Sequence, residues 1–154
     1  MCARFVMDSP VGRLAFQTEA GKLTHADYAV RDKITTQLTD PLHKTIKRQV
    51  QDYFRSAATT FDLPLALKGT PFQIKVWRAL QAIPVSKTLS YGELAARLHS
   101  SARAVGNACR ANPVPLIVPC HRVVAKNGIG GFSGKTAGAE IERKRWLLRH
   151  EGAL

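Results

Sequence analysis

The amino-acid sequence predicts an α+β fold in which a small α/β domain precedes a mostly helical domain. Three observations carry this prediction: short apolar alternations within residues 4–30, apolar residues at helical spacing from residue 41 onward, and a connector with two prolines and a glycine at 62–71. The 154 residues suffice for two small domains, each with its own core. We place the boundary between residues 1–65 and 66–154.

Residues 1–65 are expected to form an antiparallel sheet and one helix. Residues 4–16 and 22–30 hold apolar alternations on either side of Ala20-Gly21, which indicates a hairpin or a meander. A proline at position 41 is well placed to begin an amphipathic helix over residues 41–55. Five apolar residues recur there at helical spacing: Leu42, Ile46, Val50, Tyr53 and Phe54.

Residues 66–154 are expected to be mostly helical. A first helix ends at Pro84 and is marked by Phe72, Val76, Ala79, Leu80 and Ile83. Ser90 is followed three residues later by Glu93, which is a capping box that begins a second helix. Residues 99–101 interrupt the pattern and offer another cap, and residues 102–110 follow as a third helix. Two short helices joined by a tight turn predict a helix-turn-helix.

Positive charge is concentrated in the second half of the chain. The sequence has 23 Lys and Arg against 11 Asp and Glu, a net charge of +12. Residues 1–69 hold 10 basic and 7 acidic side chains, whereas residues 70–154 hold 13 basic and 4 acidic ones. A basic half favours a polyanion as partner, although a solvated basic surface would have the same composition.

The third predicted helix is rich in small side chains, namely Ala102, Ala104, Gly106 and Ala108, with Ala111 just beyond it. Small side chains let a backbone come close, either to another helix or to a nucleic-acid groove. Arg103 and Arg110 suit a buried helix contact poorly and suit DNA well. The two arginines therefore favour DNA as the partner of this helix.

Cys120 lies in an apolar run and is followed by His121 and Arg122. The thiolate is the reactive form of cysteine, and neighbouring basic groups lower the pKa of a thiol. Nearby prolines suggest that Cys120 sits at the end of a short extended segment. A buried cysteine is more often core filling, but the two basic neighbours favour a chemical role.

The remaining cysteines, Cys2 and Cys109, fit no disulfide framework with Cys120. Free thiols and the lack of a signal-peptide pattern favour the cytoplasm, and no stretch is long enough to cross a membrane. With Cys2, His25 and His43 as scattered candidate ligands, a closed zinc site is not expected. Cys109 is expected to pack as a small apolar side chain.

Together these motifs resemble the O6-alkylguanine-DNA alkyltransferases. The resemblance is dense over residues 71–154 and weaker before them, and it rests on six segments: TPFQ at 70–73, SYGELA at 90–95, ARAVG at 102–106, RANP at 110–113, PCHRV at 119–123 and WLLRHEG at 146–152. It implies a ribonuclease-H-like domain at 1–65 and a winged-helix-like DNA-binding and alkyl-acceptor domain at 66–154.

The resemblance also implies roles for individual residues. Cys120 would accept the alkyl group, His121 would act as the base that keeps it a thiolate, and Glu151 would orient His121. Because consecutive side chains on extended backbone point to opposite faces, a water is expected to bridge Cys120 and His121. Asn112 would link the third predicted helix, residues 102–110, to the reactive segment around Cys120. Tyr91 would push the 3′ phosphate and donate a hydrogen bond to guanine.

DNA would be bound through the minor groove, with the target base rotated out of the duplex. Arg103 would fill the gap left by the base, while Ala102, Ala104, Gly106 and Arg110 would contact the DNA. The expected pocket residues are Val123, Phe132, Ser133 and Pro115.

The implied reaction is irreversible transfer of one alkyl group per molecule, without cofactor or metal, by a monomer. It leaves open whether O4-alkylthymine is also repaired. Three alternatives remain: a non-catalytic protein that binds alkylated DNA, a cysteine hydrolase, and a helix-turn-helix regulator in which Cys120 is inert. The presence of Cys120 and of the first 70 residues argues against the first.

Overall fold

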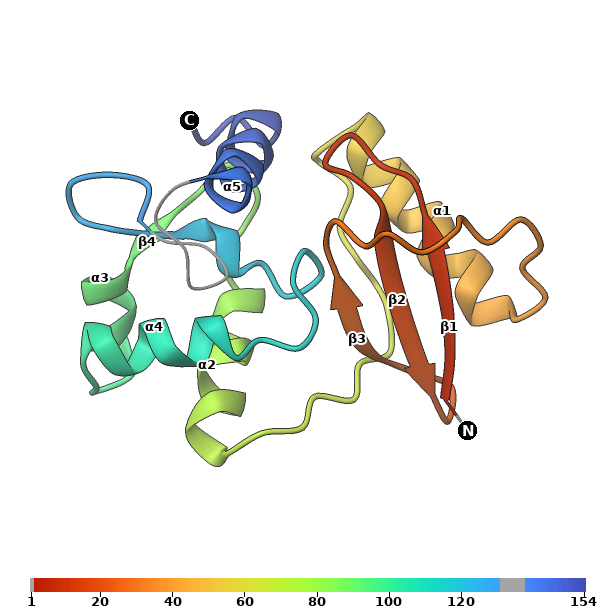
Figure 1. The fold of residues 1–154 in the computed structure, drawn as a ribbon. Coiled ribbons are helices and arrows are strands. Elements are labelled where there is room, and N and C mark those ends of the chain that lie inside the picture. Colours follow the sequence, from red (N-terminus) through yellow and green to blue (C-terminus); the bar gives the residue numbers. More distant parts are fainter. Residues whose placement is uncertain (1, 131–137) are drawn as a thin grey trace. The chain divides into compact units, whose positions relative to one another are not determined.

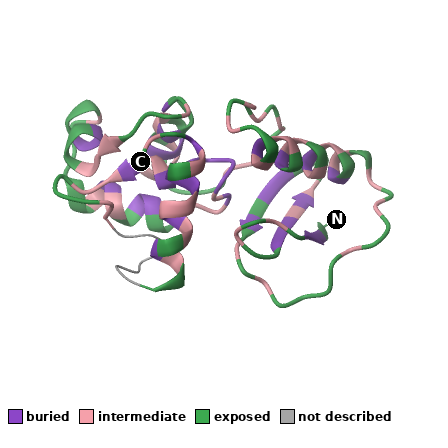
Figure 2. Cartoon of the chain, turned by 90° about the horizontal axis from the view of Figure 1, so that it is seen from above, coloured by how far each residue is buried: buried purple, intermediate pink, exposed green. Residues whose placement is uncertain are grey.

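The structure is a computed structural model that describes residues 2–130 and 138–154. The chain divides into two compact units, Met1–Leu67 and Lys68–Leu154 (Figure 1). Each unit buries apolar side chains of its own (Figure 2). Within the described residues, none of the helices combines the length and the apolar character that a membrane span requires.

The first unit contains a three-stranded antiparallel sheet. Its strands are β1 (Cys2–Met7), β2 (Leu14–Glu19) and β3 (Lys22–Asp27), and they lie in this order in the sheet. The β2–β3 turn consists of Ala20 and Gly21, with φ values of 52° and 75°. A two-residue turn with both φ angles positive matches the right-handed twist of paired strands. The predicted meander is therefore confirmed.

Helix α1 (Pro41–Arg55) has the predicted bounds and packs on this sheet. The side chain of Asp40 accepts a hydrogen bond from the backbone of Leu42 and thereby caps the helix. Nε2 of His43 lies 2.8 Å from the hydroxyl of Thr18 on β2, and its ring contacts that of Phe5 on β1 in a tilted arrangement with centroids 4.8 Å apart. The buried face of the helix consists of His43, Ile46, Val50 and Tyr53.

The first residues of the predicted connector pair with the three-stranded sheet. The backbone N–H of Leu23 donates to Pro64 at 2.8 Å, and the N–H of Ala66 donates to Leu23 at 3.0 Å. These bonds pair residues 64–66 with the edge of β3. Sequence patterns missed this because a short extended segment next to proline has no periodicity of its own.

The second unit is mostly helical, as predicted. Its helices are α2 (Pro71–Gln81), α3 (Tyr91–Arg97), α4 (Ala102–Arg110) and α5 (Ala139–His150), and its short elements are β4 (Leu89–Ser90), η1 (Cys120–Arg122) and β5 (Val123–Val124). Capping boxes begin two of the helices: Thr70 with Gln73 for α2, and Ser90 with Glu93 for α3. The strands β4 and β5 are parallel, which ties the start of α3 to the segment after Cys120.

Trp77 joins α2 to α4 and does more than fill the core. Its ring is 1% exposed, and its Nε1 donates to the carbonyl oxygen of Ala108 at 2.8 Å. The last four carbonyls of a helix lack partners within the helix, and Ala108 is among them in α4. Trp77 therefore satisfies a buried acceptor and fixes the angle at which α4 leaves the core.

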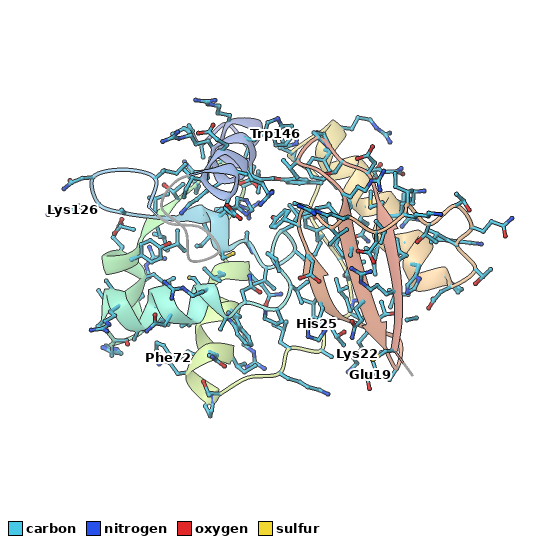
Figure 3. All side chains as sticks on the ribbon, viewed as in Figure 1. Glu19, Lys22, His25, Phe72, Lys126 and Trp146 are labelled. Atoms are coloured by element: carbon cyan, nitrogen blue, oxygen red, sulfur yellow. The ribbon has the colours of Figure 1, made fainter. Side chains whose placement is uncertain are left out.

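We expect Trp77→Phe to lower the free energy of unfolding of the second unit by about 1–3 kcal/mol, because it leaves the Ala108 carbonyl buried without its donor. Denaturant titration measures the loss. The matched control is Trp146→Phe on α5 (Figure 3), a residue that is only half-buried and whose ring stacks on His150. Equal losses in the two variants would show that the hydrogen bond to α4 is not the cause.

Candidate active site

The segment that contains Cys120 is a tight turn rather than an extended strand. Cys120–Arg122 form the 3₁₀-helix η1 directly after a reversal of the chain. At the reversal Leu116 has φ 76°, and the N–H of Val118 donates to the oxygen of Val114 at 2.9 Å. The prolines in this stretch lack the N–H that a strand ladder needs. The predicted extended backbone is therefore wrong here, and with it the expectation that neighbouring side chains point to opposite faces.

His121 and Glu151 are joined by a buried hydrogen bond. Nε2 of His121 lies 2.7 Å from Oε2 of Glu151, and the two residues are 0% and 4% exposed. An ionised carboxylate can only accept, so Nε2 carries the proton and Nδ1 carries the lone pair. Nδ1 is buried and has no hydrogen-bond partner within the described residues. The imidazole thus offers an available base on the side opposite Glu151.

Arg122 holds the same carboxylate from a second direction. Its Nε donates to Oε1 of Glu151 at 2.8 Å and its Nη2 to Oε2 at 3.1 Å, while its Nη1 donates to the carbonyl oxygen of Ile83 at 2.7 Å. The sequence analysis treated Arg122 only as a charge near Cys120 and missed this role. An arginine within an apolar segment of sequence needs a charged partner if it is buried, and this requirement could have pointed to a carboxylate near Arg122.

The thiol and the imidazole are both driven toward their neutral forms. Burial raises the pKa of Cys120, against smaller lowering contributions from the hydrogen bond with Asn112 and the charge of Lys144. Burial also lowers the pKa of His121, although the hydrogen bond and the charge of Glu151 act in the opposite direction. Both shifts act toward a neutral thiol and a neutral imidazole in the resting site.

Asn112 connects the end of α4 to the reactive segment through three hydrogen bonds. Its backbone N–H donates to Cys109 at 3.2 Å, its Nδ2 donates to the oxygen of Val118 at 2.8 Å, and its Oδ1 accepts from the N–H of Val114 at 3.0 Å. Asn112 thus bonds to the end of α4 on one side and to residues 114 and 118 of the reactive segment on the other. Movement of α4 is coupled to the turn that precedes Cys120.

Tyr91, the first residue of α3, is half-buried between two glycines. A Cβ atom at Gly106 would lie 4.0 Å from the Tyr91 ring, and one at Gly130, where φ is 78°, would lie 3.1 Å from it. Burial raises the pKa of Tyr91 to about 12, with smaller contributions from Cys109 and Cys120. The phenol therefore keeps its proton at neutral pH and can donate it in a hydrogen bond.

The residues expected to contact DNA lie on the outer side of α4. Ala102, Arg103 and Arg110 are exposed, and Ala104 and Gly106 are half-buried. The opposite side of the helix is buried and consists of Val105, Ala108 and Cys109. The exposed Asn107 belongs to the outer side as well, and the sequence analysis did not name it.

Of the expected pocket residues, Val123 is buried and Pro115 is half-buried. Phe132 and Ser133 lie outside the described residues. A residue that the sequence analysis missed is Lys144, which is 0% exposed and whose Nζ donates to the oxygen of Val123 at 2.7 Å. In residues 2–130 and 138–154, no three His, Cys, Asp or Glu side chains cluster in a way that could hold a metal ion.

Comparison with known proteins identifies the family of this chain. Residues 71–153 match the family described as 6-O-methylguanine DNA methyltransferase, DNA binding domain. The constitutive methylated-DNA–protein-cysteine methyltransferase of Bacillus subtilis is 40% identical over 94% of this chain and 92% of its own length. The methylated-DNA–protein-cysteine methyltransferase of Methanosarcina acetivorans is 34% identical over 96% and 97%.

Solved structures give the same result over the whole chain. The O6-methylguanine methyltransferase of Mycobacterium tuberculosis has a TM-score of 0.80 at 35% identity, covering 99% of this chain and 94% of that one. The OGT protein of the same organism in complex with DNA has a TM-score of 0.80 at 39% identity, covering 97% and 92%. On its sequence and its fold, this chain belongs to the methylated-DNA–protein-cysteine methyltransferase family.

Proposed function

We propose that this chain repairs O6-alkylguanine in DNA directly, by moving the alkyl group onto the sulfur of Cys120. The observation that carries the proposal is the buried arrangement of Cys120, His121 and Glu151 with a 2.7 Å hydrogen bond between the last two. It lies within the residues that match the family, whose named members are methyltransferases of methylated DNA. The strand pair that precedes Tyr91 and the hydrogen bond from Lys144 to Val123 border the same segment.

The proton and the electron pair follow a simple path in this proposal. Nδ1 of His121 takes the thiol proton of Cys120, directly or through a water, while Glu151 holds the imidazolium that forms. The sulfur attacks the alkyl carbon, a C–S bond forms, and the bond from that carbon to O6 breaks. The electron pair leaves with guanine, and the Tyr91 phenol donates a hydrogen bond to the ring as negative charge develops.

The product is a thioether, which explains why each molecule acts once. A thioether has no electrophilic carbonyl for water to attack, and the proposed chemistry includes no second step that removes the alkyl group. The reaction needs no cofactor. Free thiols at Cys2, Cys109 and Cys120 suit a reducing compartment, and we place the protein in the cytoplasm.

For DNA we propose docking of α4 in the minor groove, as one protein molecule per lesion. The exposed Arg103 fills the space of the rotated base, and Arg110 contacts the backbone. The carbonyl oxygen of Val123 accepts from the amino group of guanine, and Pro115 lines the pocket. The residue pair Phe132 and Ser133 is assigned to the same pocket by family resemblance.

Residues 1–65 are proposed to remain clear of DNA. This domain carries little of the net positive charge, with 10 basic against 7 acidic side chains in residues 1–69. Protection mapping on bound DNA tests the assignment. A footprint that included residues 1–65 would contradict it.

Methylated duplex DNA should add one methyl group per protein molecule, on Cys120, and activity should stop after one equivalent. Trypsin separates the two nearby cysteines, since cleavage after Arg103, Arg110 and Arg122 places Cys109 in residues 104–110 and Cys120 in residues 111–122. Mass spectrometry of the two peptides therefore locates the methyl group. Several turnovers per molecule would overturn the proposal.

Cys120→Ser should abolish transfer and leave DNA binding intact, because a hydroxyl is far less acidic than a thiol and stays protonated beside the same base. Cys2→Ser is the control, since Cys2 is exposed and lies in the first unit. Methylation of the Cys120→Ser variant, or loss of transfer in Cys2→Ser, would contradict the assignment of the acceptor.

Arg103→Ala should slow repair of duplex DNA by about tenfold or more, since an unfilled gap leaves the unstacking cost of a few kcal/mol uncompensated. Nonspecific DNA affinity should change only as much as the loss of one charge requires. Arg97→Ala is the matched control, because Arg97 is an exposed arginine on α3. Equal repair rates in the two variants would show that Arg103 does not fill the gap.

The transfer rate should have a broad pH plateau. The lowered pKa of His121 keeps the imidazole neutral as the pH falls through 6.5, so the base stays available at the acid end of the range. Ionisation of Cys120 at high pH forms the nucleophile itself and does not end the plateau. Imidazole ¹⁵N spectra should show Nε2 protonated and Nδ1 unprotonated at pH 6.5. Glu151→Gln should lower the pKa of His121 further, because Glu151 raises it. A protonated His121 at pH 6.5 would rule out the proposed base.

A further inference from the structure

The second unit contains a cavity that is separate from the Cys120 site. It has a volume of about 370 Å³ and lies where the end of α2, the turn after it, β4 and α3 come together (Figure 1). Protein sites for small molecules have volumes of roughly 300–1,000 Å³, so the cavity is large enough for a compact ligand. Within the described part of the chain, none of the residues proposed for alkyl transfer or DNA contact lines it.

The wall of the cavity is mostly apolar. Its deepest side chains are Ile83, which is 4% exposed, and Leu94 of α3, which is 1% exposed. Ala79 of α2 and Leu89 of β4 are half-buried, and Pro84 is exposed. The cavity therefore reaches from the surface down to the core of this unit. An apolar group that enters it leaves water and packs on apolar side chains, which favours binding.

The charged side chains that line the cavity are both cations. They are Lys87 and Arg97, and both are exposed. Among the described lining residues no side chain is acidic. Glu93 lies on the same helix as Arg97, but its Oε1 accepts the backbone N–H of Ser90 at 3.0 Å in the helix cap. An apolar cavity with two cations at its mouth is complementary to a ligand with one apolar part and one anionic group.

A tight turn holds Lys87 beside the apolar end of α2. The backbone N–H of Lys87 donates to the oxygen of Pro84 at 3.2 Å, and Ser86 inside this turn has φ 70°. Residues other than glycine seldom adopt such a positive φ, and they keep it only where the surrounding structure requires it. The position of Lys87 at the mouth is therefore set by the fold before any ligand arrives.

We propose that this cavity binds a small amphipathic anion, namely a molecule with an aliphatic or aromatic body and one carboxylate. The body would cover Ile83 and Leu94, and the carboxylate would lie between Lys87 and Arg97. A compact cavity with two cations suits a single anionic group better than the row of charges on an acidic peptide. The proposal concerns a second site and does not depend on the chemistry at Cys120.

Two residues of the cavity wall are bonded to the reactive segment. The carbonyl oxygen of Ile83 accepts from Nη1 of Arg122 at 2.7 Å. Leu89 on β4 pairs with Val123 on β5. A ligand in the cavity should therefore shift the NMR signals of Arg122 and Val123, in addition to those of the residues that it touches.

The test is a ¹H–¹⁵N NMR titration of the full chain with octanoate, which combines an eight-carbon chain with a carboxylate. We expect saturable shifts in residues 82–89 and 94–97. Octanol, which has the same chain without the charge, should bind more weakly, and acetate, which has the charge without the chain, should produce no saturable shifts. Equal affinity for octanol and octanoate would overturn the role of the cations.

The double variant Lys87→Gln with Arg97→Gln should weaken octanoate binding by about two- to fivefold for each cation removed, as expected for exposed charge pairs, and leave octanol binding unchanged. The matched control is Lys75→Gln with Arg78→Gln, which removes two exposed cations of α2 that do not line the cavity. Equal weakening in both double variants would show a general attraction to the basic protein and overturn the site.

Ala82→Phe should block the body of the ligand, because Ala82 lines the cavity and its backbone, with φ −83° and ψ −9°, accepts any side chain. Unchanged octanoate binding in folded Ala82→Phe would contradict the proposed position. If thermal melts show that this variant does not fold, the two double variants decide. Loss of octanoate binding in saturating unmodified duplex DNA would place the cavity in the DNA interface and overturn a separate site. An acidic peptide with one leucine that binds more tightly than octanoate would overturn the choice of a small molecule.

Discussion

Glu151 accepts hydrogen bonds from His121 and Arg122 at once, and the chemistry of the second unit depends on this sharing. Arg122 compensates the negative charge of the carboxylate, so His121 can stay neutral while its Nε2–H remains fixed by the hydrogen bond. The charge of Arg122 indeed contributes to lowering the pKa of His121. Burial is the larger cause of the lowered pKa of His121, and Arg122 adds to it by offsetting the carboxylate charge that favours an imidazolium.

Helix α2 ties α4 to the segment that holds Cys120. Its Trp77 bonds to the end of α4, and Ile83, just past its last turn, bonds to Arg122. The parallel pair β4–β5 adds a third constraint, because it aligns the start of α3 with the segment after η1. For the proposed transfer, these constraints hold α4 and the Cys120 segment at a fixed spacing before DNA binds, which is what preorganisation requires.

Much of the fold could be predicted from the sequence, because local signals and packing agree in it. Residues 41–55 and 102–110 carry strong caps and apolar periodicity, and both helices have the predicted bounds. The reactive segment could not be predicted, since its apolar run resembles a strand while its prolines and the positive φ of Leu116 impose a turn. A tertiary constraint decided that conformation.

The site could be predicted only as far as its residues carry a motif. Cys120 and His121 stand out in the sequence, and Glu151 was found through family resemblance. Arg122 and Lys144 were missed because their roles come from partners that are distant in sequence: Arg122 lies 29 residues from Glu151, and Lys144 lies 21 residues from Val123. The sequence does show a lysine among the apolar positions of α5, and the structure adds that this lysine is buried.

The position of α5 after Cys120 in the chain has a consequence for synthesis on the ribosome. Folding proceeds from the N-terminus as the chain emerges. The helix-turn-helix and Cys120 are complete before residues 139–151, which bring Lys144 and Glu151. A nascent chain that ends before α5 therefore lacks Glu151, which in the finished protein holds the imidazole of His121. The base of the proposed mechanism is oriented only once the last helix has been made.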